Sequence, residues 1–330
     1  MPEGHSVHRI ARQFARNFVG HRVAASSPQG RFAVGAAELD GLRMRAAFAV
    51  GKQMFLEFEH DRWLRVHLGL YGAWDFGGKV VSAAAYAAAQ KRLTEAQQLS
   101  ALTIDEEFVD DAGENSLHSI GAPRLARIRM SEDEKMSVVA GTFPAEPVGA
   151  VRVRLLTAKT VADLRGPTAC EVIDDTEVKA VMARLGPDPL VDDPQVGEDR
   201  FATKVLKKPT PIGLLLMDQA VVSGIGNVYR AELLFRNRLN PKTPGKLIPE
   251  ELVRELWKDW SRLLIVGVEL GQMMTMDGLD DDGYRAALVR RDSRHWVYHR
   301  TGLPCRICRT PIAMELAATR KLYWCPSCQE

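Results

Sequence analysis

The sequence predicts an α+β fold, in which a strand-rich N-terminal half is followed by a helical C-terminal half. The length of 330 residues is enough for about two domains. Short runs rich in β-branched and aromatic residues, separated by turn residues, favour an antiparallel sheet or sandwich over alternating βαβ units. From residue 200 onward, apolar residues recur at helical spacing. Apolar residues make up 46% and charged residues 26%, as is typical of a soluble globular protein.

The N-terminal half begins with a predicted helix at residues 4–18. Its apolar residues would share one face, which gives the helix a side to bury: Val7, Ile10, Ala11, Phe14 and Phe18. Strand-like runs follow at residues 22–26, 42–49, 53–59, 63–68 and 150–157.

The block 77–147 interrupts these strand signals. It holds an Ala- and Gln-rich stretch at 83–100 that is compatible with a helix, and an acidic stretch at 105–114. Residues 79–147 contain 7 Lys and Arg against 11 Asp and Glu, a net charge of −4. We interpret the block as an insertion folded onto the surface of the strand-rich half.

The segment 187–199 is the expected linker, because it is rich in proline and acidic residues. The predicted domains are therefore a strand-rich part at 1–186, a helical part at 200–301 and a cysteine-rich end at 302–330. Within the helical part we expect helices at 211–220, 227–235 and 249–274.

Charge is distributed unevenly, although the net charge is only +2. Residues 200–330 contain 21 Lys and Arg against 14 Asp and Glu, a net charge of +7 that favours a polyanionic partner. No apolar run is long enough to span a bilayer, so we expect no membrane partner. The N-terminus also lacks the pattern of an export signal, which favours a cytoplasmic protein.

Four of the five cysteines form two Cys-x-x-Cys pairs in the last 26 residues. The ligand candidates are Cys305, Cys308, Cys325 and Cys328, with 16 residues between the pairs. Four thiolates suit a closed tetrahedral zinc site, and this spacing is typical of a zinc ribbon with a connecting β-hairpin. We therefore predict one structural Zn²⁺, with Arg320 near the tip of the hairpin.

The N-terminus itself has catalytic potential. If Met1 is removed, Pro2 carries a free secondary amine, which is a good nucleophile toward an aldehyde-type carbon. A carboxylate follows at once, on Glu3. The amine would lie at the positive end of the helix dipole, which favours its neutral form. Alone, these residues are only a weak indication, because any chain can begin this way.

Two further motifs are compatible with anion binding. Residues 218–232 predict one helix end, two glycine turns and a new helix start, where exposed N–H groups and the amide of Asn227 could bind a phosphate. A plain helix–turn–helix hairpin is an equal alternative.

In the second motif, Lys52 and His67 could contact a phosphate. Leu70 and Tyr71 could form a wedge that fills the gap left by an extruded base, or they could be core residues.

Together these motifs resemble the formamidopyrimidine-DNA glycosylase / endonuclease VIII family. The resemblance covers residues 1–4, 51–52, 67–72, 218–232 and 297–328, in the order of the family, and leaves only the block 77–147 without a counterpart. The opening Pro2-Glu3-Gly4, and Leu70-Tyr71-Gly72 after His67, are closer to the endonuclease VIII branch.

The resemblance implies a bilobal fold. A β-sandwich lobe would carry the catalytic N-terminal helix, and a helix–two-turns–helix lobe would carry the zinc-ribbon hairpin. It also implies a monomeric bacterial enzyme, cytoplasmic and associated with the nucleoid, that binds damaged DNA.

By the same resemblance, Pro2 attacks C1′ of the damaged nucleotide and leaves a Schiff base, and Glu3 acts as general acid/base. Lys52 is the third catalytic residue, which contacts the flanking phosphate and assists the reaction. The DNA-binding residues would be His67, Leu70, Tyr71, Asn227 and Arg320. The implied function is a bifunctional DNA glycosylase and abasic-site lyase of base excision repair that acts on oxidised pyrimidines.

Two other functions are compatible with the sequence. One is a lyase that acts mainly on abasic sites. The other is a non-catalytic zinc-ribbon DNA-binding protein, which would have no reason to keep Pro2 and Glu3 together. Their joint presence favours an enzyme.

Overall fold

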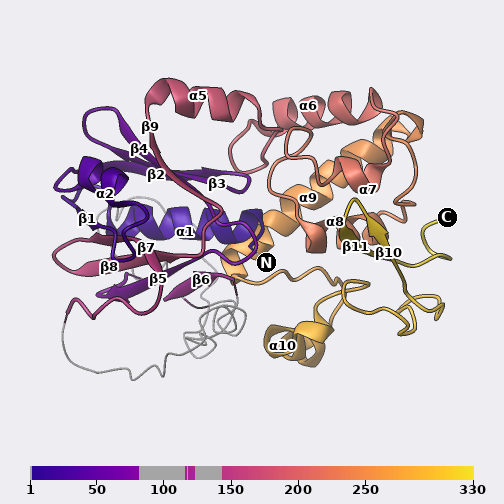
Figure 1. The fold of residues 1–330 in the computed structure, drawn as a ribbon. Coiled ribbons are helices and arrows are strands. Elements are labelled where there is room, and N and C mark those ends of the chain that lie inside the picture. Colours follow the sequence, from indigo (N-terminus) through magenta and orange to yellow (C-terminus); the bar gives the residue numbers. More distant parts are fainter. Residues whose placement is uncertain (1, 82–115, 117, 123–142) are drawn as a thin grey trace, which may run out of the picture. The chain divides into compact units, whose positions relative to one another are not determined.

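A computed structural model of the protein describes residues 2–81, 116, 118–122 and 143–330 (Figure 1). The chain divides into two compact units. The helical unit holds residues 181–330 together with two short N-terminal pieces, residues 3–5 and 50–52. The strand-rich unit holds the other described residues.

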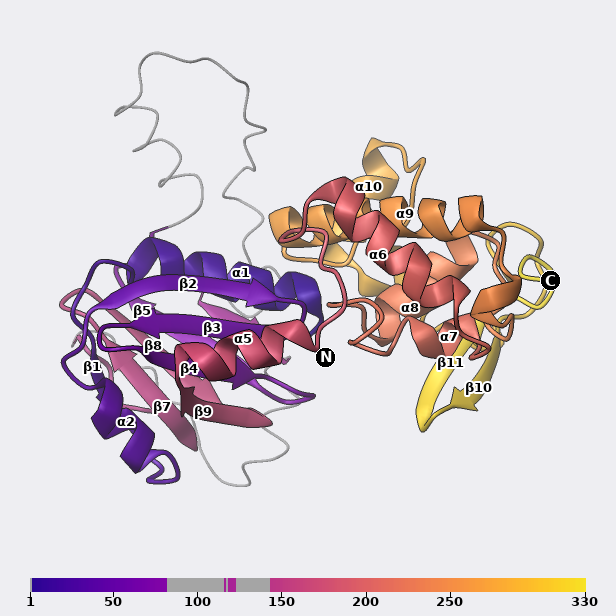
Figure 2. The same ribbon diagram turned by 90° about the horizontal axis from the view of Figure 1, so that it is seen from above.

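The strand-rich unit is built from two sheets. The five-stranded sheet has the order β1-β7-β8-β5-β6 and the four-stranded sheet the order β2-β3-β4-β9. In Figure 2, β2, β3 and β4 run side by side. The strands are β1 (Ala24–Ser26), β2 (Met44–Val50), β3 (Gln53–Phe58), β4 (Arg62–His67), β5 (Ala73–Gly78), β6 (Ser119–Gly121), β7 (Val151–Leu156), β8 (Thr160–Arg165) and β9 (Ala169–Ile173).

Helix α1 (Gly4–Asn17) packs on the strands through aromatic side chains. The ring of Phe14 lies 4.7 Å from that of Trp74 and 5.2 Å from that of Phe76, both on β5. In Figure 1, α1 lies between the two sheets. The strands contribute alternate residues to the same core, as in β7, where Val151 and Val153 are buried. The predicted sandwich is therefore confirmed.

Short helices complete this part of the chain. Helix α2 (Ala33–Leu39) follows β1, and α5 (Asp175–Ala183) follows β9.

The helical unit has a separate core around the long helix α9. Trp260 of α9 packs edge-on against Tyr229 of α8, with their ring centroids 4.8 Å apart. The elements are α6 (Pro194–Leu206), α7 (Ile212–Leu215), α8 (Asn227–Arg236), η2 (Gly245–Leu247), α9 (Glu250–Leu270), α10 (Asp281–Val289), η3 (Arg291–Ser293), β10 (Ala313–Ala317) and β11 (Arg320–Trp324). Strands β10 and β11 pair as an antiparallel hairpin, as the zinc-ribbon interpretation predicts.

Two parts of the helical half differ from the prediction. The helix expected at 211–220 is limited to α7, because side chains beyond it bond to the backbone: Ala220 N–H donates to Asp218 Oδ1 at 2.9 Å, and Gln219 Nε2 to the carbonyl of Ile225 at 3.1 Å. Within the segment expected as a linker, α6 begins at Pro194. Proline suits the first turn of a helix, and the Asp193 side chain caps it.

The described part of the block 77–147 belongs partly to the sheet. Strand β6 pairs with β5, and Ile120 is buried in the core, so this short piece is not a surface insertion. The helix expected at 83–100 and the acidic stretch at 105–114 lie outside the described residues. Among the helices of the described ranges, none has both the length and the apolar character needed to cross a bilayer.

Candidate active site and zinc ribbon

The carboxylate of Glu3 occupies the N-terminus of helix α8. Its Oε1 accepts a hydrogen bond from the N–H of Val228 at 2.8 Å. Its Oε2 accepts one from Gly226 N–H at 2.8 Å and a longer one from Tyr229 N–H at 3.4 Å. The side chain is fully buried. The N–H groups at a helix start favour a negative charge, so the anion site predicted in residues 218–232 is filled by the protein's own carboxylate.

Glycines allow the N-terminus to approach this loop. The N–H of Gly4 donates to the carbonyl of Gly224 at 2.9 Å. An ideal Cβ at Gly4 would lie 2.9 Å from Cα of Gly224, and one at Gly226 would lie 2.3 Å from Cδ of Glu3. Both are closer than a real Cβ contact. A side chain at Gly4 would therefore push against the backbone of Gly224, and one at Gly226 would displace the carboxyl group of Glu3.

Lys52 reaches the same loop from the turn between β2 and β3. Its Nζ donates to the carbonyl of Ile225 at 2.6 Å. Burial lowers the pKa of Lys52 to about 8; the charge of Glu3 opposes this shift, and that of Arg320 adds to it. Lys52 is therefore an amine whose proton is labile near neutral pH.

The turn that presents Lys52 is held by a buried aspartate. Gly51 has φ = 59°, a conformation that glycine adopts without strain, and its N–H donates to Asp188 Oδ2 at 2.5 Å. A Cβ at Gly51 would lie 2.7 Å from Cβ of Ser223. The turn is thus packed directly on the loop that precedes α8.

Pro2 is buried and directly precedes Glu3 in the chain. Its nitrogen therefore stands one residue from a carboxylate whose position is fixed by backbone donors. Glu3 and Lys52 converge on residues 225–228, so the structure brings together the two charged residues predicted to be catalytic.

Asn227 and Arg230, one helical turn apart on α8, hold the hairpin. Asn227 Nδ2 donates to the carbonyl of Lys321 at 2.8 Å. Arg230 Nη2 donates to the same carbonyl at 3.2 Å and also to Asn227 Oδ1. The Arg230 side chain is only 1% exposed, and burial lowers its pKa to about 10. Asn227, predicted to bind a phosphate, here positions the strand that begins with Arg320.

Arg320 follows a two-residue turn at the tip of the hairpin. Ala317 pairs with Arg320, so Ala318 and Thr319 form the turn, with φ of 48° and 68°. Positive φ at both central residues is the geometry of a primed hairpin turn. Arg320 is exposed. Its predicted place near the hairpin tip is correct.

In the strand-rich unit, Leu70 and Tyr71 lie on a tight turn after β4. The turn is closed by a hydrogen bond from Gly72 N–H to the carbonyl of Leu68 at 3.0 Å. Leu70 is 50% exposed and Tyr71 45%, so they are not core residues. His67 is the last residue of β4, and its carbonyl accepts from Thr168 N–H at 2.9 Å.

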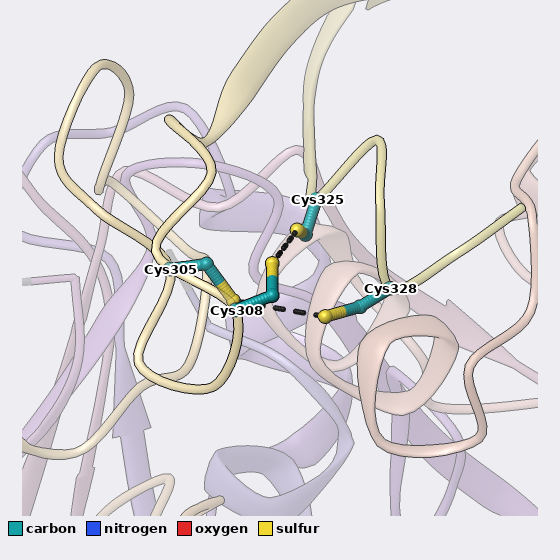
Figure 3. Close-up of side chains that lie close together, drawn as sticks. All are labelled: Cys305, Cys308, Cys325 and Cys328. Atoms are coloured by element: carbon teal, nitrogen blue, oxygen red, sulfur yellow. Dashed lines mark hydrogen bonds between the residues drawn. The ribbon is translucent and has the colours of Figure 1, made fainter.

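The four predicted zinc ligands meet at one point (Figure 3). Their sulfur atoms all lie within 4.8 Å of one another, with 3.4 Å between Cys308 and Cys325 and 3.9 Å between Cys305 and Cys328. A tetrahedral zinc with four sulfurs at about 2.3 Å needs sulfur atoms about 3.8 Å apart. The donor set therefore fits one zinc ion with no open position, which is a structural site.

The zinc ribbon is joined to the helical core through buried polar contacts. Gln329 is fully buried; its Oε1 accepts from Cys325 N–H at 2.8 Å, and its Nε2 donates to the carbonyl of Leu239 at 3.0 Å. Apolar residues on both sides pack together, Phe235 of α8 and Tyr323 of β11 among them.

The segment before the ribbon is held by Glu232, two residues after Arg230 on α8. Its carboxylate accepts the N–H groups of Trp296, Val297 and Tyr298 at 2.8 to 2.9 Å, and the hydroxyl of Thr275 at 2.6 Å. Burial raises the pKa of Glu232, while these hydrogen bonds oppose the rise. Helix α8 therefore binds the carboxylate of Glu3 at its N-terminus, and the carboxylate of Glu232 from its middle binds the segment 296–298.

Sequence reasoning did not identify three of these residues. Arg230 lies three residues after Asn227, so the helical period could have placed both on one face. Glu232 lies within the same motif and shows no sign of its partners. Asp188 lies in the expected linker, and no local pattern links it to Gly51, 137 residues away.

Three known protein families match consecutive parts of the chain. The formamidopyrimidine-DNA glycosylase N-terminal domain matches residues 1–109, the H2TH domain of the same enzymes residues 185–277, and the zinc finger found in FPG and IleRS residues 302–330. The zinc-finger match, together with the cysteine cluster, confirms the predicted structural zinc.

Among characterised proteins, "Endonuclease 8 1" of Mycobacterium tuberculosis is 38% identical over 329 residues, with 100% of both chains covered. The formamidopyrimidine-DNA glycosylase of Thermus thermophilus is 36% identical over 152 residues, 45% of this chain and 55% of that protein.

Solved structures share the fold. The complex of wild-type Lactococcus lactis Fpg with DNA containing N7-benzyl-Fapy-dG matches with a TM-score of 0.68 at 18% identity, covering 100% of both chains. The Fpg protein of Thermus thermophilus matches with a TM-score of 0.64 at 22% identity, covering 99% of this chain and 98% of that one. These similarities confirm the predicted α+β architecture.

Proposed function

Because this chain belongs to the formamidopyrimidine-DNA glycosylase / endonuclease VIII family of base excision repair, we propose that it is a bifunctional glycosylase and abasic-site lyase for oxidised pyrimidines. Damaged DNA would be the partner and a single chain the active form. The sequence likeness to "Endonuclease 8 1" over the full length supports assignment to the endonuclease VIII branch.

In the proposed reaction, the secondary amine of Pro2 attacks C1′ of the damaged nucleotide. The bond between C1′ and the base breaks, and the base leaves with a proton. Opening of the sugar ring gives an iminium ion between the Pro2 nitrogen and C1′. Loss of a C2′ proton then expels the 3′ phosphate, a second elimination expels the 5′ phosphate, and water releases the amine.

Glu3 would be the general acid/base that acts on the sugar. A general acid/base must be held within hydrogen-bond reach of the proton that it moves. Three backbone donors fix the Glu3 carboxylate, and its place directly after Pro2 keeps it near any sugar bound to the amine. The fixed carboxylate of Glu3, directly after the residue that would carry the N-terminal amine once Met1 is removed, is the observation that carries the proposal.

Lys52, Asn227 and Arg320 would bind the phosphates around the extruded nucleotide, with His67 from the strand-rich unit. Phosphate contacts hold the register without reading sequence. Affinity should therefore fall steeply with salt. A base inside a duplex is out of reach of Pro2 and must be flipped, at a cost of a few kcal/mol. The exposure of Leu70 and Tyr71 supports their proposed role as a wedge that offsets part of this cost.

Borohydride trapping tests the proposal. Duplexes carrying thymine glycol, dihydrouracil, 8-oxoguanine or an abasic site are incubated with the protein and reduced, and the adduct is mapped by mass spectrometry. We expect an adduct at Pro2 with the two oxidised pyrimidines and with the abasic site. Glu3→Gln is the matched variant; it should bind the same duplexes but form adduct at least about 100-fold more slowly.

Other outcomes separate the alternatives. Trapping at the abasic site alone would favour the lyase function. Binding to every duplex with no adduct on any would favour the non-catalytic DNA-binding protein. Adduct mainly with 8-oxoguanine would overturn the choice of substrate but leave the mechanism intact.

A further inference from the structure

A histidine occupies a backbone position that usually favours glycine. The chain turns at residues 297–300, where the N–H of Arg300 donates to the carbonyl of Val297 at 3.1 Å. The third residue of this turn, His299, has φ = 59°. Positive φ at the third position is a feature of type II β-turns, in which glycine or asparagine is preferred there. Backbone strain of this kind is concentrated at functional sites, so the imidazole of His299 is a candidate for a function.

Aromatic rings hold this imidazole and leave its nitrogen atoms open. Its ring centroid lies 4.4 Å from that of Tyr298 and 5.3 Å from that of Tyr323, with interplanar angles of 33° and 39°. His299 is exposed, and neither of its ring nitrogens hydrogen-bonds to another residue of the described ranges. The two tyrosines therefore restrict the ring plane, while both nitrogens remain available to a substrate.

A short series of contacts links this ring to the carboxylate of Glu3. Glu3 accepts the N–H of Val228, the residue that follows Asn227. Burial raises the pKa of Tyr298 to about 12; the charge of Glu3 adds to the rise, and a hydrogen bond from the Asn227 side chain opposes it. Tyr298 is thus within electrostatic range of Glu3, and its ring packs on His299. His299 therefore belongs to the surroundings of the candidate active site.

The imidazole of His299 is neutral at physiological pH. Partial burial lowers the pKa of His299, and the positive charges of Arg291 and Lys321 lower it further. A neutral imidazole carries a lone pair on one nitrogen and can accept a proton there. The same two cations would attract the DNA backbone to this side of the site.

The elimination steps of the proposed function need a group that removes a proton from carbon. We propose that His299 is the general base of the first elimination: one imidazole nitrogen takes the C2′ proton of the iminium ion. The inference rests on the proposed glycosylase and lyase function.

The proposed step balances without a further reactant. The C2′–H electron pair becomes the second bond between C1′ and C2′, and the C1′–N π pair moves onto the Pro2 nitrogen, which gives an enamine. The enamine then returns this pair, a double bond forms between C2′ and C3′, and the C3′–O bond breaks. The 3′ phosphate leaves with the electrons of that bond, and water later takes the proton from the imidazolium ion.

The test separates formation of the Schiff base from elimination. A duplex with a preformed abasic site is mixed with excess enzyme, and two single-turnover rates are measured: adduct trapped by borohydride, and strand nicking without borohydride. His299→Gly removes the imidazole and keeps the turn. We expect its trapping rate to equal that of wild type and its nicking rate to fall about 100-fold, so that the trapped adduct accumulates.

Two controls distinguish proton transfer from other roles of the side chain. His299→Asn tolerates positive φ and keeps a polar group but cannot take the proton, so it should nick as slowly as His299→Gly. Free imidazole added to His299→Gly should restore nicking about tenfold or more and leave wild type unchanged. His299→Gly should also unfold at a higher denaturant concentration than wild type, because glycine relieves the strain of the turn.

The possible failures can be told apart. Nicking by His299→Gly at the wild-type rate would overturn the inference and leave the proposed function intact. An equal fall in trapping and nicking would also overturn it, because His299 would then act before the elimination. Wild-type protein that forms no adduct with the abasic site would instead refute the proposed function itself.

Discussion

A side chain at Gly226 would occupy the space of the Glu3 carboxyl group, since an ideal Cβ there lies 2.3 Å from Cδ of Glu3. The backbone of Gly226 has φ = −119°, which alanine can also adopt, so steric contact alone excludes larger residues.

Gly226→Ala should therefore impair catalysis although no charged residue is substituted. We expect the trapping rate to fall at least about 100-fold, because displacing Glu3 removes the acid/base group. Stability should fall by about 1–3 kcal/mol, since buried N–H groups lose their acceptor. Single-turnover trapping and thermal unfolding measure the two effects. In Glu3→Gln/Gly226→Ala, the second change should add little to the first; additive losses would mean that Gly226 acts elsewhere.

Lys52 should become a second nucleophile when Pro2 is blocked. A short N-terminal extension converts the nitrogen of Pro2 into an amide, which cannot form the iminium ion. The neutral amine of Lys52 is the reactive form, and with a pKa of about 8 it becomes abundant as pH rises through that value. Residual trapping should thus rise about tenfold from pH 7 to pH 9. Adding Lys52→Met should abolish it; trapping that persists would identify a different amine.

Loss of one zinc ligand should weaken DNA binding without disturbing the strand-rich unit. Cys325 is buried and directly follows β11, which is bonded through the Lys321 carbonyl to Asn227. Cys325→Ser should release zinc, measured by mass spectrometry, and raise the Kd for an abasic-site duplex about tenfold or more. The matched control is Cys170→Ser, which lies outside the cluster, on β9. Normal affinity of a zinc-free Cys325→Ser protein would contradict a structural role for the metal.

The hairpin turn before Arg320 should be more stable with glycine. Thr319 has φ = 68°, which is unfavourable for a β-branched residue. Thr319→Gly is expected to raise the free energy of unfolding by about 0.5–1 kcal/mol, measured by chemical denaturation. Ala317→Gly, in the neighbouring strand, is the control and should lower it instead. A destabilised Thr319→Gly protein would mean that the threonine hydroxyl contributes more than the strain costs.

The sequence predicted those features that depend on neighbours in the chain. The spacing of Cys305, Cys308, Cys325 and Cys328 was enough for the zinc site. Apolar periodicity was enough for α1, α8 and α9, although the helix expected at 249–274 extends past the end of α9 at Leu270. An anion site at the start of α8 was one of two equal interpretations of residues 218–232. Its occupant was not predicted, because Glu3 and Val228 are 225 residues apart and no local pattern links them. The helix expected at 211–220 failed because side-chain hydrogen bonds from Asp218 and Gln219 compete with helical ones.

The assignment of residues 3–5 and 50–52 to the helical unit has a consequence for dividing the protein. A fragment starting at Val181 would keep every helix from α6 on and all four zinc ligands. It would lack both Glu3 and Lys52, so the first N–H groups of α8 would face water and bind whatever anion the buffer supplied. A cut before Val181 would thus separate Glu3 and Lys52 from the N-terminus of α8, to which they bind. A peptide covering the N-terminus, added back in trans, would be the natural ligand of that fragment.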